Sequence, residues 1–370
     1  MKKFFGTDGI RGKTGDYPVT PDFFVKLGYA AGLVLTKNIK GNKRPSVVIG
    51  KDTRISGYML ESSLEAGFSS AGVDVYLTGP IPTPAIAFLT QSLAADIGIM
   101  ITASHNPFED NGIKLFSSCG TKLSDKVENE IEELIESEIK CVQPSKLGKA
   151  RRLDNARAQY IQFCLKTVPK ELSLKNYKIV LDCANGATYQ VAPEIFRLLG
   201  ADIVLINHEP DGLNINLQAG STHPEFLIDN VKNNKADLGI AFDGDGDRLI
   251  MVSERGDLVD GDQILYLIMD YYNNQNKLKG GVVGTLMTNL ALQEKCKFLG
   301  IPFERSNVGD RYVSEMLRRR SWQIGGENSG HIVLLEHHTT GDGIISSLQV
   351  ITALLEKNKK ISEILKELPL

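Results

Sequence analysis

The stretch YKIVLDCANGATYQVAPEIFRLLGADIVLIN, residues 177–207, contains a complete strand, loop, helix and strand. Its first apolar run ends in an Asn-Gly pair, which favours a loop, and a second apolar run follows an amphipathic segment. Short apolar strands that alternate with helices predict an α/β architecture with a largely parallel sheet. This stretch therefore predicts the unit from which the rest of the chain is built.

The same order of elements recurs on both sides of this stretch. Comparable units open with apolar runs at Val47 and Val282. Residues 141–155 lose periodicity and hold Pro, Gly and a short basic cluster, which indicates a domain boundary. We therefore predict three related α/β domains with mixed, mainly parallel sheets and an active-site cleft between them. The predicted domains are residues 1–150, with a serine loop, 151–253, with a metal loop, and 254–370, with a sugar-binding loop.

The composition is typical of a globular protein with a large core. The chain has 370 residues, is 42% hydrophobic and carries a formal net charge of −3. It has no basic stripe, so we expect no nucleic-acid partner. No apolar run is long enough to span a bilayer, and no signal-peptide pattern opens the chain, so we expect no membrane partner. The five scattered cysteines, without a C-x-x-C pair, favour a cytoplasmic location.

Three aspartates alternate in the sequence DGDGDR: Asp243, Asp245 and Asp247. Carboxylates this close repel one another unless a cation neutralises them, and oxygen ligands favour Mg²⁺ or Ca²⁺. An EF-hand is the competing interpretation, because acidic residues also fall at EF-hand ligand positions as far as Glu254. However, Arg248 stands where that loop needs glycine, and both flanks are predicted strands. We therefore predict a Mg²⁺ site presented by a strand, with Arg248 suited to a phosphate oxygen.

A second apolar strand leads into TASHNPFEDNGIK, residues 102–114, in which Ser104 stands beside His105. Side chains of adjacent residues rarely meet well, and the G-x-S-x-G elbow is absent, so we do not expect a hydrolase dyad. A serine can instead carry a phosphoryl group if a metal neutralises the charge and a cation such as Lys114 assists. A plain turn is the alternative, because Asn-Pro is common in turns.

Two glycine-rich segments offer further candidates. GTDGIRGKT, residues 6–14, misses the spacing of a P-loop by one residue but presents Arg11 as a phosphate contact. GGENSGH, residues 325–331, places Glu327 and Ser329 at alternate positions, where both could bond sugar hydroxyl or amino groups. An ordinary glycine turn would give the same pattern. Four other histidines are expected in loops or on the surface: His208, His223, His337 and His338.

Together these motifs resemble the α-D-phosphohexomutase superfamily. The matching stretches follow the family order along the whole chain: FGTDGIRG, GKDTRISG, TASHNPFEDNGIKLF, DGDGDR, VGDRYV, GGENSGH and TTGDGI. FGTDGIRG and Ala103 are more similar to the glucosamine branch than to the phosphomannomutase and phosphoglucomutase branch. The resemblance implies interconversion of glucosamine 6-phosphate and glucosamine 1-phosphate through a phosphoserine and a 1,6-bisphosphate. That reaction feeds UDP-N-acetylglucosamine and cell-wall precursor synthesis.

The resemblance also implies a role for each matching residue, with Lys114 as the general acid and base. The implied catalytic residues are Ser104, Lys114, His105 and Arg11. The implied metal ligands are Ser104, as the phosphoserine, with Asp243, Asp245 and Asp247. The implied substrate-binding residues are Glu327, Ser329, Arg248 and His331. Mg²⁺ is the implied cofactor, and glucosamine or glucose 1,6-bisphosphate is the implied activator. We expect a small phosphosugar as the substrate and a homodimer as the assembly.

Three other functions stay open. A phosphomannomutase or phosphoglucomutase would share these motifs, a Mg²⁺-dependent phosphatase would release phosphate to water, and a Ca²⁺-binding module would prefer Ca²⁺. The family also carries a small fourth domain, in which an R-x-S-G-T-E-P-like loop clamps the substrate's non-reacting phosphate. No such sequence occurs before Leu370. We therefore expect this chain to lack the clamp and to be impaired or inactive as a mutase by itself.

Overall fold

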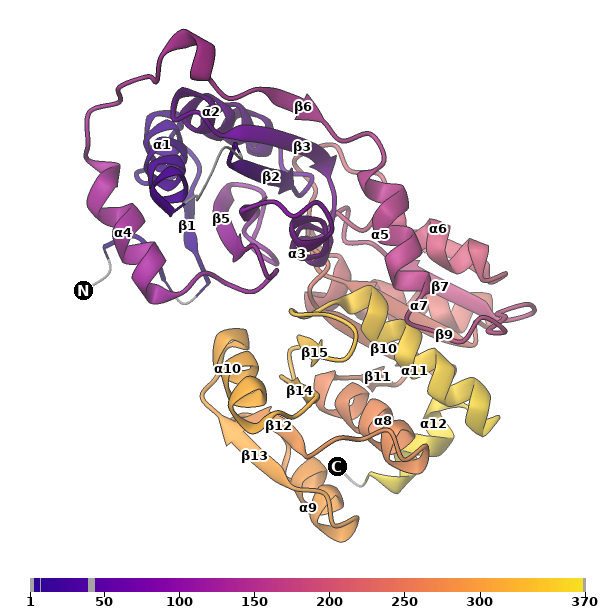
Figure 1. Cartoon of the computed structure of the whole chain (residues 1–370). Coiled ribbons are helices and arrows are strands. Elements are labelled where there is room, and N and C mark those ends of the chain that lie inside the picture. Colours follow the sequence, from indigo (N-terminus) through magenta and orange to yellow (C-terminus); the bar gives the residue numbers. More distant parts are fainter. Residues whose placement is uncertain (1–2, 7, 39–43, 369–370) are drawn as a thin grey trace. The chain divides into compact units, whose positions relative to one another are not determined.

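The structure is a computed structural model that describes residues 3–6, 8–38 and 44–368. Its strands form three sheets, and the chain divides into two compact units (Figure 1). Among the described residues, no helix combines the length and the apolar character that crossing a membrane requires. The first unit is Met1–Tyr160 with Pro210–Ile215, and the second is Ile161–Glu209 with Asn216–Leu370.

The first unit contains a six-stranded mixed sheet. Strands β4, β2, β3 and β6 run parallel to one another. Strand β5 is antiparallel to β4, and β1 is antiparallel to β5. The predicted boundary after residue 150 falls within β6, so this sheet continues two residues beyond it. In spatial order the strands are β1 (Ile10–Lys13), β5 (Asp110–Ser117), β4 (Ile97–Ile101), β2 (Ser46–Lys51), β3 (Asp74–Pro80) and β6 (Ala150–Arg152).

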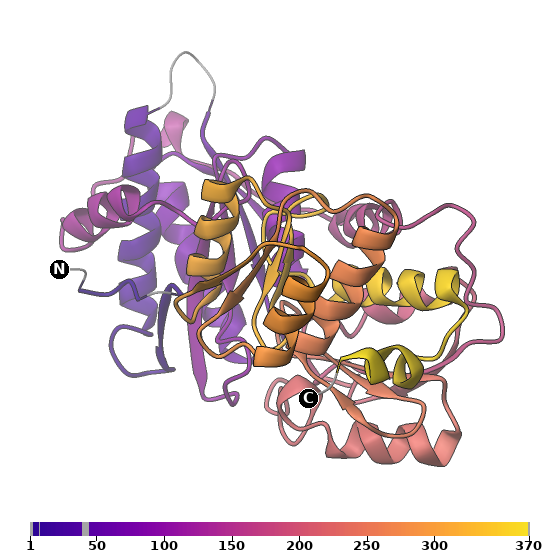
Figure 2. The ribbon, with the colours of Figure 1, turned by 90° about the horizontal axis from the view of Figure 1, so that it is seen from below.

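Helices cover both faces of this sheet, because its central strands are apolar on both sides. On one face, α3 (Thr83–Ser92) approaches closely, because Gly50 and Gly98 leave room for its Ile86 and Thr90 side chains. On the other face the alternate strand residues join one hydrophobic core, and α4 lies across α1 in Figure 2. The helices of that core are α1 (Pro21–Asn38), α2 (Ser56–Ser70) and α4 (Asp125–Ile135).

The second sheet has five strands and belongs to the second unit. Strands β9, β7 and β8 run parallel, whereas β9 and β10 form an antiparallel hairpin that β11 extends past the predicted boundary at residue 253. Helices α7 (Glu225–Asn234) and α6 (Val191–Leu198) pack on this sheet. In spatial order the strands are β11 (Leu258–Val259), β10 (Leu249–Ser253), β9 (Leu238–Phe242), β7 (Lys178–Asp182) and β8 (Asp202–Ile206).

The third sheet has four strands and belongs to the same unit. Strand β12 runs parallel to both β13 and β14, and β15 is antiparallel to β14. Helices α9 (Leu290–Phe298) and α10 (Asp310–Arg320) pack on this sheet, and Val313 and Leu317 of α10 lie in its core. In spatial order the strands are β13 (Phe303–Ser306), β12 (Val282–Thr285), β14 (Ile324–Gly326) and β15 (Ile332–Leu334).

Two almost wholly buried helices, α8 (Gly261–Asn274) and α11 (Gly343–Lys357), contact each other and both sheets of the second unit. Asp260 begins α8 with a capping box, and Asp342 begins α11 by accepting the Ile345 N–H at 3.0 Å. The predicted α/β fold with mixed, mainly parallel sheets is confirmed. The remaining helical segments are α5 (Ala156–Leu165), α12 (Ile361–Ile364) and the 3-10 turns Pro144–Lys146, Gly220–Thr222 and Leu365–Glu367.

Candidate active site

Ser104 lies in the loop between β4 and β5. The residue is only 1% exposed. Its φ of 53° lies in the left-handed region, which costs a residue with a side chain about 1–2 kcal/mol. Its Oγ lies 3.4 Å from Nδ1 of His105. This contact is at the long limit of a hydrogen bond, so the two adjacent side chains meet only weakly.

A buried network holds this serine loop. Thr102 Oγ1 accepts the Ser104 N–H at 2.8 Å and donates to Asp52 Oδ2 at 2.7 Å. Arg54 Nε donates to the same carboxylate oxygen at 2.9 Å. Burial raises the pKa of Asp52, while the charge of Arg54 and the Thr102 hydroxyl oppose that rise. The backbone at Ser104 is therefore tied to polar side chains that are themselves buried.

Arg11 and Lys114 project from the same face of the first sheet. Arg11 on β1 pairs with Gly112 on β5, and Lys114 follows two residues later on β5. A Cβ at Gly112 would lie 3.0 Å from Arg11 Cγ and 2.2 Å from the carbonyl oxygen of Ile10, so this approach requires glycine. The Gly112 carbonyl also accepts the Thr102 N–H at 3.1 Å. This row of contacts therefore joins both cationic residues to the strand that leads into the serine loop.

The glycine-rich N-terminal segment is not a P-loop. Its Gly12 and Lys13 belong to strand β1, whereas a P-loop would place them before a helix. Asp8 accepts a hydrogen bond from the Arg11 guanidinium and another from Lys122 Nζ at 2.9 Å. The segment therefore presents Arg11 from a strand, with an acidic neighbour that holds its side chain.

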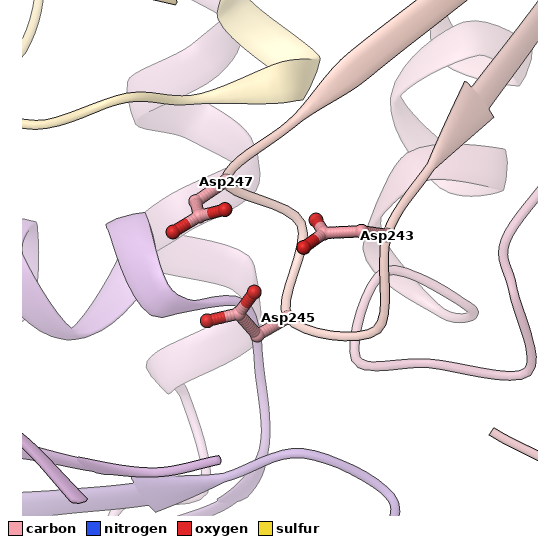
Figure 3. Close-up of side chains that lie close together, drawn as sticks. All are labelled: Asp243, Asp245 and Asp247. Carbon is pink, nitrogen blue, oxygen red and sulfur yellow. The ribbon is translucent and has the colours of Figure 1, made fainter. Parts of the chain in front are cut away.

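The three aspartates lie on the tight loop between β9 and β10 (Figure 3). Asp243, Asp245 and Asp247 are buried, and one ligand oxygen from each lies within 4.8 Å of the others. Figure 3 shows their carboxylates converging on one side of the loop. Because two strands flank the loop, the EF-hand alternative is excluded. Three buried carboxylates at this separation form a donor set that suits a hard divalent cation.

Close backbone contacts fix the metal loop. The Ala187 N–H donates to the Gly244 carbonyl at 2.8 Å, and the Gly343 N–H, at the start of α11, donates to the Gly246 carbonyl at 3.0 Å. A Cβ at Gly343 would lie 2.6 Å from the carbonyl oxygen of Arg248. The loop is therefore enclosed by main chain from two directions, and glycine permits that approach.

The GGENSGH segment contacts the strand that follows the metal loop. Gly330 has a φ of 91° and its carbonyl accepts the Leu249 N–H at 3.0 Å. A Cβ at Gly330 would lie 2.1 Å from the Leu249 carbonyl oxygen. Glu327 is buried and accepts the Gly309 N–H at 2.9 Å, whereas Ser329 is partly exposed. The structure thus places the two predicted loops of the second unit side by side.

His331 lies between two carboxylates. Its Nδ1 is 3.7 Å from Asp247 and its Nε2 is 4.0 Å from Asp310. Burial alone would lower the pKa of His331, but these carboxylates and Glu327 raise it. Burial also acts to lower the pKa of Arg248, and the aspartates of the metal loop raise it more strongly. Both cationic groups are therefore favoured in their charged forms beside the acidic loop.

The predicted site residues fall in both units. Sequence reasoning missed Asp310 and Arg54, although VGDRYV and GKDTRISG contain them. His337 and His338 lie in the loop after β15, as predicted. The sequence did not indicate that His338 is only 5% exposed or that His337 Nε2 lies 2.7 Å from the Tyr272 hydroxyl. The first unit contains Arg11, Ser104, His105 and Lys114, and the second contains Asp243, Asp245, Asp247, Arg248, Glu327, Ser329 and His331.

Comparisons with known proteins give consistent similarities. Family models described as phosphoglucomutase/phosphomannomutase α/β/α domains I, II and III match residues 2–141, 158–256 and 260–370. The chain is 58% identical, over 95% of its length and 79% of the relative's, to phosphoglucosamine mutase of Aeromonas hydrophila. It is 54% identical, over 100% of its length and 81% of the relative's, to that of Nitrosomonas europaea. A phosphoglucomutase/phosphomannomutase family protein from Burkholderia thailandensis has a TM-score of 0.83 and 26% identity, over 98% of this chain and 79% of that one.

Proposed function

The chain belongs to the phosphoglucomutase/phosphomannomutase family, and we propose that it interconverts glucosamine 6-phosphate and glucosamine 1-phosphate. The observation that carries this proposal is its identity of 58% and 54% to two phosphoglucosamine mutases over nearly its whole length. The buried serine loop and the cluster of three aspartates supply the residues that such a phosphoryl transfer needs. The product would feed the synthesis of UDP-N-acetylglucosamine and cell-wall precursors.

In the first half of the proposed reaction, phosphorylated Ser104 gives its phosphoryl group to O1 of glucosamine 6-phosphate. The bond from Ser104 Oγ to phosphorus breaks as the bond from O1 to phosphorus forms. The O1 hydroxyl loses its proton, and Ser104 Oγ gains one. We assign this proton transfer to Lys114, with His105 beside the Oγ. Arg11, on the same sheet face as Lys114, would bind oxygens of the transferring group.

In the second half, the 1,6-bisphosphate turns over and presents its 6-phosphoryl group to Ser104. The serine hydroxyl gives up its proton, its Oγ bonds to phosphorus, and O6 leaves with a proton as glucosamine 1-phosphate forms. No atom is gained or lost over the two halves of the reaction, and the phosphoserine is restored. Glucosamine or glucose 1,6-bisphosphate would act as the activator, because either could phosphorylate an unmodified Ser104.

Asp243, Asp245 and Asp247 would hold Mg²⁺, with an oxygen of phosphorylated Ser104 as a further ligand. The fit rests on three buried carboxylates whose ligand oxygens lie within 4.8 Å of one another. Bound Mg²⁺ would neutralise negative charge on the transferring phosphoryl group. These aspartates would also fix the position of the ion, since backbone contacts hold their loop from two sides.

The GGENSGH segment would select the sugar. Glu327 offers a buried carboxylate that can pair with the amino group of glucosamine, and Ser329 can bond a neighbouring hydroxyl. Arg248 and His331 would bind the phosphate, because the surrounding carboxylates favour their charged forms.

We also propose that the protein is cytoplasmic and forms a homodimer. Light scattering of the purified protein would test the dimer.

The proposal is tested by adding glucosamine 6-phosphate, Mg²⁺ and glucose 1,6-bisphosphate to the full-length protein and following phosphorus NMR signals. Glucosamine 1-phosphate should appear until equilibrium is reached, while inorganic phosphate stays constant. Release of inorganic phosphate in proportion to substrate would support a phosphatase and contradict the mutase. Faster conversion of mannose 6-phosphate or glucose 6-phosphate than of glucosamine 6-phosphate would contradict the proposed sugar.

A further inference from the structure

Arg54 is fully buried, with 0% exposure, and lies against the serine loop of the first unit. Its two terminal nitrogens donate to four carbonyl oxygens of that loop. Its Nε donates to Asp52 at 2.9 Å. The guanidinium group has five N–H donors, and these five contacts use all of them. The four carbonyl partners are those of Ser104 at 3.0 Å, Asn106 at 2.9 Å, Asp110 at 3.0 Å and Pro107.

These contacts close a ring around Ser104. The Ser104 carbonyl accepts from Arg54, and the Ser104 N–H donates to Thr102 Oγ1. Thr102 and Arg54 both donate to Asp52 Oδ2, at 2.7 and 2.9 Å. One network therefore holds the peptide groups on both sides of a residue whose φ is 53°. A left-handed conformation in a residue with a side chain needs such support from its surroundings.

We propose that Arg54 is a positioning residue for phosphoryl transfer. Together with Asp52 and Thr102, it holds the Ser104 backbone in the conformation that sets the direction of the Oγ. This inference rests on the proposed role of Ser104 as the phosphoryl carrier. Arg54 acts through the loop backbone, because its five donors are already engaged and none is left to bind a phosphate oxygen.

Lysine could not replace this arrangement. Its ammonium group has three donors at a single point, whereas the planar fork of arginine reaches carbonyl oxygens that are spread along the loop. An Arg54→Lys substitution would keep a positive charge beside Asp52 but would leave some loop carbonyls without a donor. A Thr102→Val substitution would remove the hydroxyl that links the Ser104 N–H to Asp52, and Thr102→Ser would keep it.

The test measures single-turnover transfer from phosphorylated protein to glucosamine 6-phosphate. In Arg54→Lys and in Thr102→Val the transfer rate should fall by about 10–100-fold, the effect expected when a reacting group is displaced by about 1 Å. The KM for the sugar phosphate should stay within about twofold, since a positioning residue contributes to the reacting geometry rather than to ground-state binding. Thr102→Ser should restore transfer. Backbone amides of residues 102–111 should exchange faster with deuterium in the two slow variants.

Val73→Ala is the matched control for a general loss of stability. Val73 is also 0% exposed, and it precedes β3 at the end of the sheet away from the serine loop. This variant should melt at a lower temperature without a slower transfer. If Arg54→Lys does not fold, the comparison of Thr102→Val with Thr102→Ser still decides the question.

Three results would overturn the inference. The first is a wild-type transfer rate in both Arg54→Lys and Thr102→Val. The second is a fall in transfer rate no greater than that of Val73→Ala at a matched melting temperature. The third is a rise in KM with an unchanged transfer rate. If wild-type Ser104 accepts no phosphoryl group, the proposed function fails instead. Deuterium exchange still tests Arg54 in that case. Unchanged exchange at residues 102–111 in both variants would show that Arg54 does not stabilise the loop backbone.

Discussion

The serine loop and the metal loop both follow buried strands, but they are held in different ways. Side chains hold the serine loop, since Arg54 and Thr102 bond its backbone and Asp52 joins them. Main chain holds the metal loop, because Ala187 and Gly343 bond its carbonyls directly. The first loop should therefore be sensitive to the loss of polar groups, and the second to the addition of volume.

The difference suits the chemistry proposed for each loop. Ser104 must both give and accept a phosphoryl group, so its loop needs a fixed backbone from which the side chain can act. The aspartates must instead converge on one point, and glycines beside them allow the main chain to approach closely. Substitutions in the two regions can test this contrast.

The largest effect is expected for Ser104→Ala. This change removes the phosphoryl carrier but keeps the loop network, which bonds only the backbone of residue 104. Mutase activity should fall by about 10⁴-fold or more, the scale seen when a covalent nucleophile is removed. The melting temperature should stay close to that of the wild type. Activity that survives this change would show that another residue carries the group.

The next largest effect is expected for Asp245→Asn. Loss of one charge from three buried carboxylates should weaken Mg²⁺ binding and lower activity by about 10²–10³-fold at low Mg²⁺. Activity measured over a range of Mg²⁺ concentrations should recover in part at high concentration. Asp229→Asn, on the exposed side of α7, is the matched control and should behave as the wild type. Equal Mg²⁺ dependence in both variants would exclude the metal loop as the binding site.

A smaller effect, on stability, is expected for Gly330→Ala. The new Cβ would lie 2.1 Å from the Leu249 carbonyl oxygen, at a φ of 91°. The free energy of unfolding should fall by about 3 kcal/mol from steric clash and backbone strain together. Gly300→Ala is the control, since its φ is 70° but nothing lies within 4 Å of the new Cβ. Its free energy of unfolding should fall by about 1 kcal/mol, from backbone strain alone. Equal losses in the two variants would contradict the close packing beside the metal loop.

Sequence patterns predicted the strands well, because the periodicity of apolar residues and the residues that favour turns are local signals. The predicted strand at residues 45–50 is β2, and the strand, helix and strand of residues 177–207 are β7, α6 and β8. The cluster of Asp243, Asp245 and Asp247 was also predicted, because the sequence places the three carboxylates directly after an apolar strand. These predictions needed only the order of apolar and polar residues along the chain.

Long-range contacts could not be predicted in the same way. Arg54 donates a hydrogen bond to the carbonyl of Ser104, which is 50 residues away. No feature of GKDTRISG indicates which loop its guanidinium reaches. His337 likewise forms a hydrogen bond with Tyr272, which is 65 residues away. The second and third sheets share one compact unit because α8 and α11 contact both, and periodicity within a helix does not identify its two partners.

The smallest effect concerns Asp182, a buried carboxylate at the end of β7. Asp182 accepts hydrogen bonds from the Ala184 and Gly220 N–H groups and from Asn207, and burial raises its pKa to about 6. The folded state then keeps a proton that the unfolded chain loses near its ordinary pKa of 3.8. Between these values the folded state binds more protons, so its stability falls as the pH rises.

The stability of the wild type relative to Asp182→Asn should therefore fall by about 2 kcal/mol between about pH 4.5 and 7.5, at ~1.4 kcal/mol per pH unit below the folded pKa. Chemical unfolding of both proteins over this range measures the difference, and other titrating groups cancel in it. A difference that is constant or that grows with pH would show that the hydrogen bonds to Asp182 outweigh its burial.

The role of Ser104 as the phosphoryl carrier is tested most directly by the mass of the intact protein, with phosphopeptide mapping, after incubation with glucose 1,6-bisphosphate and Mg²⁺. We expect one added phosphoryl group, located on Ser104, that is lost when excess glucosamine 6-phosphate is added and glucosamine 1,6-bisphosphate appears. A protein that gains no phosphoryl group, or that gains it at another residue, would show that Ser104 is not the carrier.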